Sequence, residues 1–194
     1  MRVISGIAKG RTLKSPGEAT RPVTDRVKEN LFNILGSRVQ DANVLDLFAG
    51  AGSIGIEALS RGARHSTFVE LDREALRAIY QNLELTGLTE RAKVVKLDVF
   101  KFIRHSSPPL LDTGEGKGGG YDLIYIAPPQ YKELWSETLK QLNGRGFLSD
   151  KGIVVAQIYP KEYHELELSE FVIYDQRTYG STMLCFYRKS DKGT

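Results

Sequence analysis

One glycine-rich junction constrains the fold of this chain more than any other stretch. Residues 44–48 form a short apolar run with the length of a buried strand, and residues 53–59 have the apolar spacing of a helix. Gly50, Gly52 and Gly55 form a Gly-x-Gly-x-x-Gly pattern at the junction. Glycines let the backbone turn sharply beside a ligand, and a helix N-terminus offers N–H groups that have no partner inside the helix. The pattern predicts a turn that binds an adenosine-containing cofactor, without choosing between a dinucleotide and another such cofactor.

Strand-like and helix-like segments alternate from this junction onward. The strand-like runs are residues 44–48, 66–71, 93–97, 121–126 and 152–157. Two closing runs, residues 171–175 and 182–187, are typical of an antiparallel hairpin. Five strand–helix units followed by a hairpin predict one domain over residues 1–194. Its fold class is α/β, with a doubly wound, mainly parallel sheet of the Rossmann-like kind and a C-terminal antiparallel hairpin.

The N-terminal residues 1–38 are expected to form a small basic extension. Residues 2–14 have the pattern of a hairpin with a basic turn. Thr24 or Asp25 can cap a helix that ends at Gly36. The expected apolar face of that helix consists of Val27, Leu31, Ile34 and Leu35. This extension carries eight Lys/Arg against three Asp/Glu, a balance of +5, whereas the remainder carries 19 against 21, a balance of −2. Such a charge distribution favours contact of this extension with a polyanion. The alternative is that the extension is a terminal arm whose charges face only solvent.

Composition excludes several classes of protein. The apolar runs are shorter than the roughly 20 residues of a membrane span, and the N-terminus lacks the apolar core of a signal peptide. A single cysteine, Cys185, excludes an internal disulfide framework and fits a reducing compartment. Three scattered histidines and one cysteine have no metal-ligand spacing, so no metal is expected. We expect a cytoplasmic monomer, with a flexible insertion at residues 105–120 that is rich in Gly, Pro and Ser.

Acidic residues follow three successive predicted strands. Asp46 lies before the glycines, Glu70 ends the second strand, and Asp98 follows the third. Each acid taken singly is more typical of a helix cap than of a ligand contact. Because the carboxyl ends of parallel strands meet at one edge of a sheet, a shared ligand is the better interpretation of the set. Glu70 can accept hydrogen bonds from both hydroxyls of a ribose, and Asp98 can accept one from an adenine amino group.

Several stretches resemble one enzyme family. Residues 46–55, DLFAGAGSIG, resemble motif I of class I S-adenosylmethionine-dependent methyltransferases. Residues 20–35, TRPVTDRVKENLFNIL, resemble the N-terminal part of the bacterial enzymes that methylate a guanine exocyclic N2 in small-subunit (16S) ribosomal RNA. Residues 55–63, 68–72 and 179–182 fit the same family. The resemblance covers nearly the whole chain except residues 105–120.

The resemblance implies S-adenosylmethionine as cofactor and ribosomal RNA as substrate. Gly50 and Gly52 would approach the methionine part of the cofactor, and Asp46 would bind its amino group directly or through water. The implied cofactor-binding residues are Thr24, Arg26, Asp46, Phe48, Gly50, Gly52, Glu70, Leu71, Asp98 and Val99. Lys9, Arg11 and Arg21 would contact RNA phosphates, which positions the RNA without reading its sequence.

The fourth motif of this family differs here. The family has Asp or Asn followed by Pro-Pro and an aromatic residue; the acid accepts from the target amine, and the aromatic stacks on the flipped base. This chain has Ala127, Pro128, Pro129, Gln130 and Tyr131. Losing one preorganised hydrogen bond commonly costs on the order of 10²–10³ in rate. The last four of these residues are the predicted catalytic residues, with Gln130 as the substitute acceptor.

Three alternatives to this function remain. The acceptor could be an adenine amine in DNA or an amine in a protein, although no separate target-recognition domain is visible. The chain could instead bind the cofactor and RNA with weak or lost catalysis, as Ala127 suggests. An NAD-dependent dehydrogenase is disfavoured because Asp46 precedes the glycines and Pro128-Pro129 ends the fourth strand.

Overall fold

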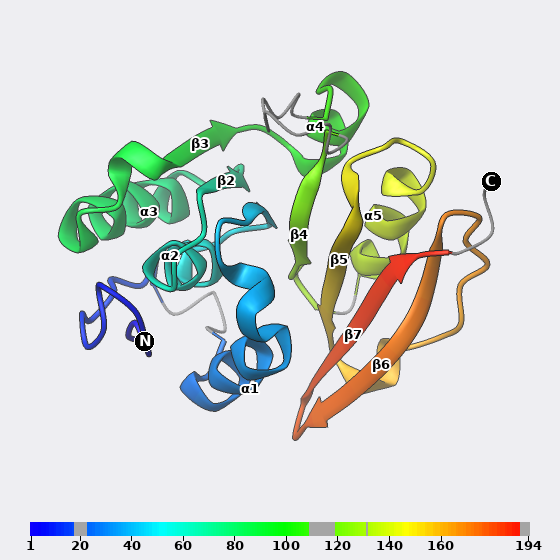
Figure 1. Ribbon diagram of the computed structural model, residues 1–194, viewed down its shortest axis with the longest axis horizontal. Coiled ribbons are helices and arrows are strands. Elements are labelled where there is room, and N and C mark those ends of the chain that lie inside the picture. Colours follow the sequence, from blue (N-terminus) through cyan, green and yellow to red (C-terminus); the bar gives the residue numbers. More distant parts are fainter. Residues whose placement is uncertain (18–22, 109–118, 131, 191–194) are drawn as a thin grey trace. The chain divides into compact units, whose positions relative to one another are not determined.

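The computed structural model describes residues 1–17, 23–108, 119–130 and 132–190. These residues divide into two compact units, Met1–Val99 and Phe100–Thr194. Figure 1 shows the helices and strands of both. None of the helices in the described part of the chain is long and apolar enough to cross a membrane.

A parallel sheet forms the centre of the first unit. Its strands are β1 (Asn43–Leu47), β2 (His65–Glu70) and β3 (Ala92–Lys96), in the order β3-β2-β1 (Figure 1). All five residues of β1 are buried, as its apolar sequence predicts. The register places Asp46 opposite Phe68 and Glu70 opposite Lys96. The acidic ends of neighbouring strands therefore meet at one edge of this sheet.

The described part of the first unit contains three α-helices, and the first has the predicted caps, Thr24 and Gly36. The helices are α1 (Asp25–Leu35), α2 (Ser53–Ser60) and α3 (Arg73–Thr86). The Thr24 hydroxyl accepts from the Val27 amide at 3.3 Å, and the Asp72 carboxylate accepts from the Ala75 amide at 2.9 Å. Short 3-10 turns cover Gly36–Val39 and Thr89–Arg91, and α4 (Val99–His105) begins with the last residue of this unit.

The expected apolar face of α1 was partly wrong. Val27, Leu31 and Leu35 are buried, as predicted, but Ile34 is half-exposed. Lys28 and Phe32 are buried instead. The buried face is rotated because Lys28 finds an acidic partner inside the protein, Glu57 on α2.

Residues 1–14, called the N-terminal arm below, double back as predicted but do not form two regular strands. The backbone pairs through one isolated bridge between Arg2 and Thr12 and through bonds such as Val3 N–H to Arg11 C=O at 2.9 Å. Between these pairs the arm bonds to α2, where the Ile7 N–H donates to the Ser60 carbonyl at 2.9 Å. The basic hairpin is therefore a loop docked on a helix rather than a free ribbon.

The second unit contains a mixed sheet. Its strands are β4 (Tyr121–Ile126), β5 (Leu148–Ile158), β6 (Phe171–Tyr179) and β7 (Thr182–Lys189), in the order β4-β5-β7-β6. β4 and β5 are parallel, while β7 runs antiparallel to both β5 and β6, which confirms the predicted C-terminal hairpin. The helix α5 (Leu134–Leu142) buries Trp135, whose ring lies 5.1 Å from that of His164, so the tryptophan serves packing. Cys185 is buried in β7.

The fifth strand–helix unit was predicted wrongly. Residues 159–170 between β5 and β6 contain a 3-10 turn, Pro160–Glu162, and no α-helix. Pro160 is the first residue of this turn, a position where its missing N–H costs nothing, and the turn ends after one round at Glu162.

Candidate active site

The glycine turn, residues 48–52, has an unusual backbone. Phe48, Gly50 and Gly52 have φ values of 59°, 55° and 75°. A non-glycine residue in this left-handed region costs of order 1–3 kcal/mol, so Phe48 marks a place where the surrounding structure imposes strain. A Cβ on Gly50 would meet no atom within 4 Å, so the turn is uncovered on this side. Glycine is needed there for its backbone conformation.

The third glycine has a different task. A Cβ on Gly55 would lie 2.3 Å from the Phe68 ring, so a side chain at this position would push α2 away from β2. The Gly55 N–H also donates to the Asp46 carboxyl at 3.0 Å. The motif therefore combines a turn open to a ligand with a helix that packs tightly on the sheet.

Asp46 is a buried carboxyl group beside this turn. Burial raises its pKa to about 8, and the nearby Glu70 adds to this, while the Gly55 N–H opposes it. The carboxyl group therefore holds a proton at neutral pH in the structure described. A cationic group placed beside it would favour the ionised form.

Glu70 joins the end of β2 to the glycine turn. One carboxylate oxygen accepts from the Gly50 N–H at 2.8 Å, and the other accepts from the Leu71 and Asp72 N–H groups at 2.7 and 2.9 Å. A carboxylate has about four acceptor positions, so these three N–H bonds leave one position, on the oxygen that holds the Gly50 N–H, for a ligand hydroxyl. Leu71 next to it is 57% exposed, which offers an apolar surface to a flat ring.

The remaining predicted cofactor residues are placed less uniformly. Asp98 stands two residues after the end of β3. The Leu97 N–H between them donates to the Glu70 carbonyl at 3.2 Å, which brings this strand end beside Glu70. Val99 is buried. Thr24 uses its hydroxyl to cap α1, and Arg26 is exposed on that helix.

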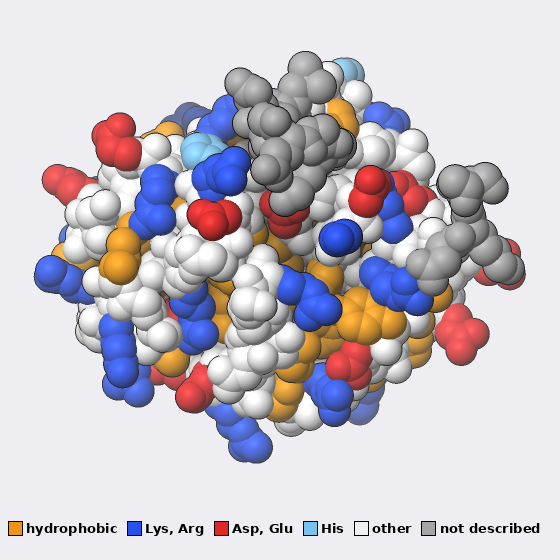
Figure 2. Space-filling model, viewed as in Figure 1, with side chains coloured by type: hydrophobic (Ala, Val, Ile, Leu, Met, Phe, Trp, Pro, Cys, Tyr) orange, Lys and Arg blue, Asp and Glu red, His pale blue; other side chains and the backbone are white. Residues whose placement is uncertain are grey.

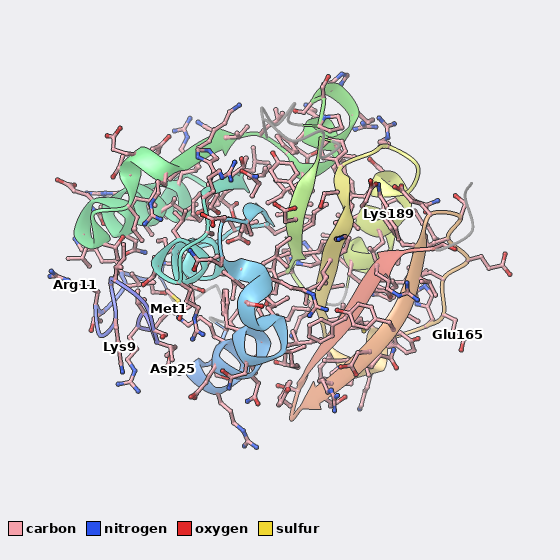
Figure 3. All side chains as sticks on the ribbon, viewed as in Figure 1. Met1, Lys9, Arg11, Asp25, Glu165 and Lys189 are labelled. Atoms are coloured by element: carbon pink, nitrogen blue, oxygen red, sulfur yellow. The ribbon has the colours of Figure 1, made fainter. Side chains whose placement is uncertain are left out.

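The predicted RNA contacts lie partly on the arm. Lys9 and Arg11 are exposed, and Figure 3 shows both pointing away from the arm. Basic side chains also lie along the left and lower left of the face in Figure 2, where Figure 1 draws the arm. Arg21 lies outside the described residues.

The predicted catalytic turn belongs to the second unit. β4 ends at Ile126, so Ala127 follows directly, as the sequence predicts. Pro129 is exposed, and Ala127, Pro128 and Gln130 are half-buried. Tyr131 and most of the insertion expected at residues 105–120 lie outside the described residues.

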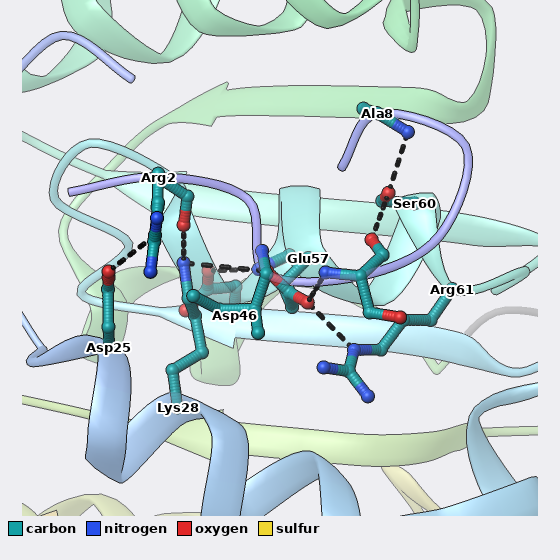
Figure 4. A network of polar contacts seen from close by, with 11 residues as sticks. Arg2, Ala8, Asp25, Lys28, Asp46, Glu57, Ser60 and Arg61 are labelled. Atoms are coloured by element: carbon teal, nitrogen blue, oxygen red, sulfur yellow. Dashed lines mark hydrogen bonds and ion pairs between the residues drawn. The ribbon is translucent and has the colours of Figure 1, made fainter. Parts of the chain in front are cut away.

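Two buried polar sites of the first unit were not predicted from the sequence, the Lys28–Glu57 ion pair and Asn82. Lys28 and Glu57 are fully buried with their charged atoms 3.5 Å apart, and Arg61 bonds the same Glu57 carboxylate at 2.7 Å (Figure 4). Asn82 is also fully buried. A signal was present, because Lys28 and Asn82 stand at the apolar spacing of their helices, and a polar residue in that position needs a buried partner.

Comparison with known proteins agrees with this geometry. YlbH of Bacillus subtilis, a candidate rRNA methyltransferase, is 36% identical over 97% of this chain and 99% of its own length. The ribosomal RNA small subunit methyltransferase D of Escherichia coli is 35% identical over 81% of this chain and 74% of its own. The structure of yhhF, a candidate methyltransferase of Escherichia coli, superposes with a TM-score of 0.84 at 29% identity and covers 99% of both chains.

A parallel sheet with a glycine turn and carboxyl groups at its strand ends, together with these similarities, defines a class I methyltransferase with a Rossmann-like fold. Within that class, the family model described as conserved hypothetical protein 95 matches residues 1–188. The chain belongs to this family.

Proposed function

We propose that this protein transfers a methyl group from S-adenosylmethionine to the exocyclic N2 of a guanine in 16S ribosomal RNA. The observation that carries the proposal is the Glu70 carboxylate bonded to Gly50 of the open glycine turn. Support for the substrate comes from the small-subunit ribosomal RNA methyltransferases among the relatives. We further propose that the enzyme acts as a cytoplasmic monomer and that its substrate is a small-subunit particle.

The residues present fit this cofactor. Glu70 has one acceptor position left for a ribose hydroxyl, and the exposed Leu71 offers an apolar surface to the adenine. Asp98 would accept from the adenine amino group. The buried Asp46 would hold the methionine ammonium, and the space beside Gly50 would receive the methionine part. Bound there, the cofactor supplies an electrophilic methyl group, so the protein needs mainly to position the acceptor amine in line with it.

The turn after β4 would orient that amine. The Pro128 carbonyl can accept one N–H of the guanine amino group, which directs the nitrogen lone pair toward the methyl group. The Ala127 side chain has no acceptor, so the Gln130 amide oxygen would take the part of the missing carboxylate. Tyr131 would stack on the flipped base. The exposed Lys9 and Arg11, together with Arg21, would hold RNA phosphates.

Methyl transfer is tested with labelled S-adenosylmethionine and two acceptors, small subunits that lack the modification and naked 16S rRNA. We expect label in a guanine N2 of the particle and less in the naked RNA. Binding of S-adenosylhomocysteine and RNA without transfer would instead establish a binding protein with lost catalysis, which the alanine at position 127 favours as the second candidate. Label in DNA or protein would contradict the proposed substrate.

The role of Gln130 gives a sharper prediction. We expect Gln130→Ala to lower kcat by about 10²–10³ with little change in S-adenosylhomocysteine affinity, because one preorganised acceptor is lost. Gln141→Ala on α5, whose side chain bonds Glu137 on the helix surface, is the matched control and should retain activity. Single-turnover methyl transfer measures both. Full activity of Gln130→Ala would contradict this role, and activity gained by Ala127→Asp would show that the natural turn is a poor catalyst.

A further inference from the structure

Asn82 on α3 connects two parts of the first unit that are distant in sequence. Its side-chain oxygen accepts from the Lys14 N–H at 2.7 Å, and its amide group donates to the Lys14 carbonyl at 3.0 Å. The same amide group donates to the Ala51 carbonyl at 3.0 Å. Ala51 lies between Gly50 and Gly52, so one buried side chain bonds both the N-terminal arm and the glycine turn.

The arm is firmly attached along its length. Buried Glu57 accepts from the Ile4 and Ser5 N–H groups at 2.7 and 3.0 Å, and the Ser60 hydroxyl accepts from the Ala8 N–H at 3.0 Å (Figure 4). The Lys28 ammonium donates to the Arg2 carbonyl. These bonds fix the arm against α2. A displacement of the glycine turn is therefore transmitted to the arm and is not absorbed by a loose segment.

A continuous set of hydrogen bonds runs from the ribose side of the turn to the arm. The Glu70 carboxylate holds the Gly50 N–H, Ala51 follows Gly50 in the chain, and the Ala51 carbonyl is held by Asn82. Asn82 in turn holds both polar groups of the Lys14 backbone. Lys9 and Arg11 lie on the same arm a few residues earlier.

We propose that Asn82 is a positioning residue that couples the cofactor site to the RNA-binding arm. A ligand that orders the glycine turn fixes the Ala51 carbonyl, which fixes the Asn82 amide and with it Lys14. Because the arm is docked, the arrangement of the turn that the cofactor favours also sets the arrangement of Lys14 and of the basic residues before it, and RNA binds that arrangement more tightly. By thermodynamic reciprocity, RNA on the arm must strengthen cofactor binding by the same factor. This inference rests on the proposed function and adds to it a link between its two ligands.

The coupling is measured as the ratio of the dissociation constants for an unmethylated 16S rRNA transcript without and with saturating S-adenosylhomocysteine. We expect a ratio of about 5 or more in the wild type, within the usual range of allosteric coupling. Asn82→Asp keeps the acceptor for the Lys14 N–H but loses both donated bonds, so its ratio should fall below about 2. Asn143→Asp is the matched control, since it also keeps an acceptor for a backbone N–H, that of Glu170, and loses a donated bond, that to Ser169. Its ratio should equal that of the wild type.

Hydrogen exchange provides a readout that needs no RNA. In the wild type, S-adenosylhomocysteine should slow exchange of the Lys14 and Leu13 amides, and in Asn82→Asp it should not. If Asn82→Asp does not fold, Asn82→Leu, which has the same branched arrangement of heavy atoms and lacks all three bonds, serves for both measurements. A wild-type ratio near 1, or an unchanged ratio in the variant, overturns the coupling while methyl transfer stays intact. A wild type that binds neither ligand overturns the proposed function as well.

Discussion

At the scale of the residue, Asp46 shows how the fold changes the chemistry of one group. Burial raises its pKa from 3.8 to about 8. A carboxyl group with a raised pKa contributes stability that is fully present below its unfolded pKa and is lost as the pH rises through its folded pKa. A bound ammonium group would reverse this preference, because it favours the carboxylate. Folding and cofactor binding therefore place opposite demands on this one proton.

Asp46→Asn tests both demands. Between about pH 4 and pH 8 the free energy of unfolding of the wild type should fall relative to that of the variant, which has no proton to lose at this position. Urea denaturation at several pH values measures this difference. The wild-type affinity for S-adenosylhomocysteine should rise from about pH 6 to pH 8, with proton release at low pH visible by calorimetry in buffers of different ionisation enthalpy. A parallel pH dependence in wild type and variant would assign the titration to another group.

At the scale of the element, the N-terminal arm is held by close contact with α2. Gly6 has a φ of 83°, and a Cβ there would lie 1.8 Å from the Ser60 carbonyl oxygen. Gly10 has nearly the same φ, 84°, but a Cβ there would meet no atom within 4 Å. An alanine at either position would have the same unfavourable φ, but only at Gly6 would its methyl group collide with another atom.

This pair of glycines separates docking from strain. Gly10→Ala should destabilise the protein by about 1–3 kcal/mol, the cost of a left-handed non-glycine residue. Gly6→Ala should cost more or release the arm, because the new methyl group cannot fit against Ser60. Thermal unfolding gives the stability of both variants, and limited proteolysis at Lys9 and Arg11 reports release of the arm. Equal protection of the arm in both variants would show that its docking tolerates the added group.

The elements differ in how far the sequence predicts them. The strands, the glycine turn and the place of Glu70 at the end of a strand could be predicted, because local apolar runs and a short motif determine them. The docking of the arm could not, because the partners of its backbone are Glu57, Ser60 and Asn82, which lie about 50 to 70 residues away in the chain. The same holds for the buried face of α1, since the environment that admits Lys28 is supplied by Glu57. A local sequence pattern does not identify the distant backbone group that a polar side chain bonds. A polar residue at an apolar position of a helix indicates only that it needs such a partner.

At the scale of the whole molecule, the structure changes how the charge distribution is interpreted. Residues 1–38 carry a balance of +5, but Lys28 is buried against Glu57, which lies outside that segment. It therefore cannot meet a polyanion. The exposed basic residues in the described part of the extension are Arg2, Lys9, Arg11, Lys14, Arg26 and Arg38. Arg2 is itself paired with Asp25 at 3.0 Å. Lys9 and Arg11, the two predicted phosphate contacts in the described part of the arm, therefore remain available to neutralise phosphates.

Salt dependence of RNA binding tests this assignment. Each phosphate neutralised by a basic residue contributes about 0.7–0.9 to the slope of log Kobs against log salt concentration. The double variant Lys9→Ala/Arg11→Ala should therefore lower the slope by about 1.4–1.8 and raise the KM for RNA, while kcat at saturating RNA is retained. Lys151→Ala/Lys161→Ala removes the same charge from exposed positions of the second unit and should leave the slope near its wild-type value. Equal slopes in the two double variants would mean that net charge, rather than the arm, attracts the RNA. In this proposal kcat depends on the turn after β4, and the salt dependence of RNA binding depends on the arm. The two measurements therefore separate RNA binding from methyl transfer.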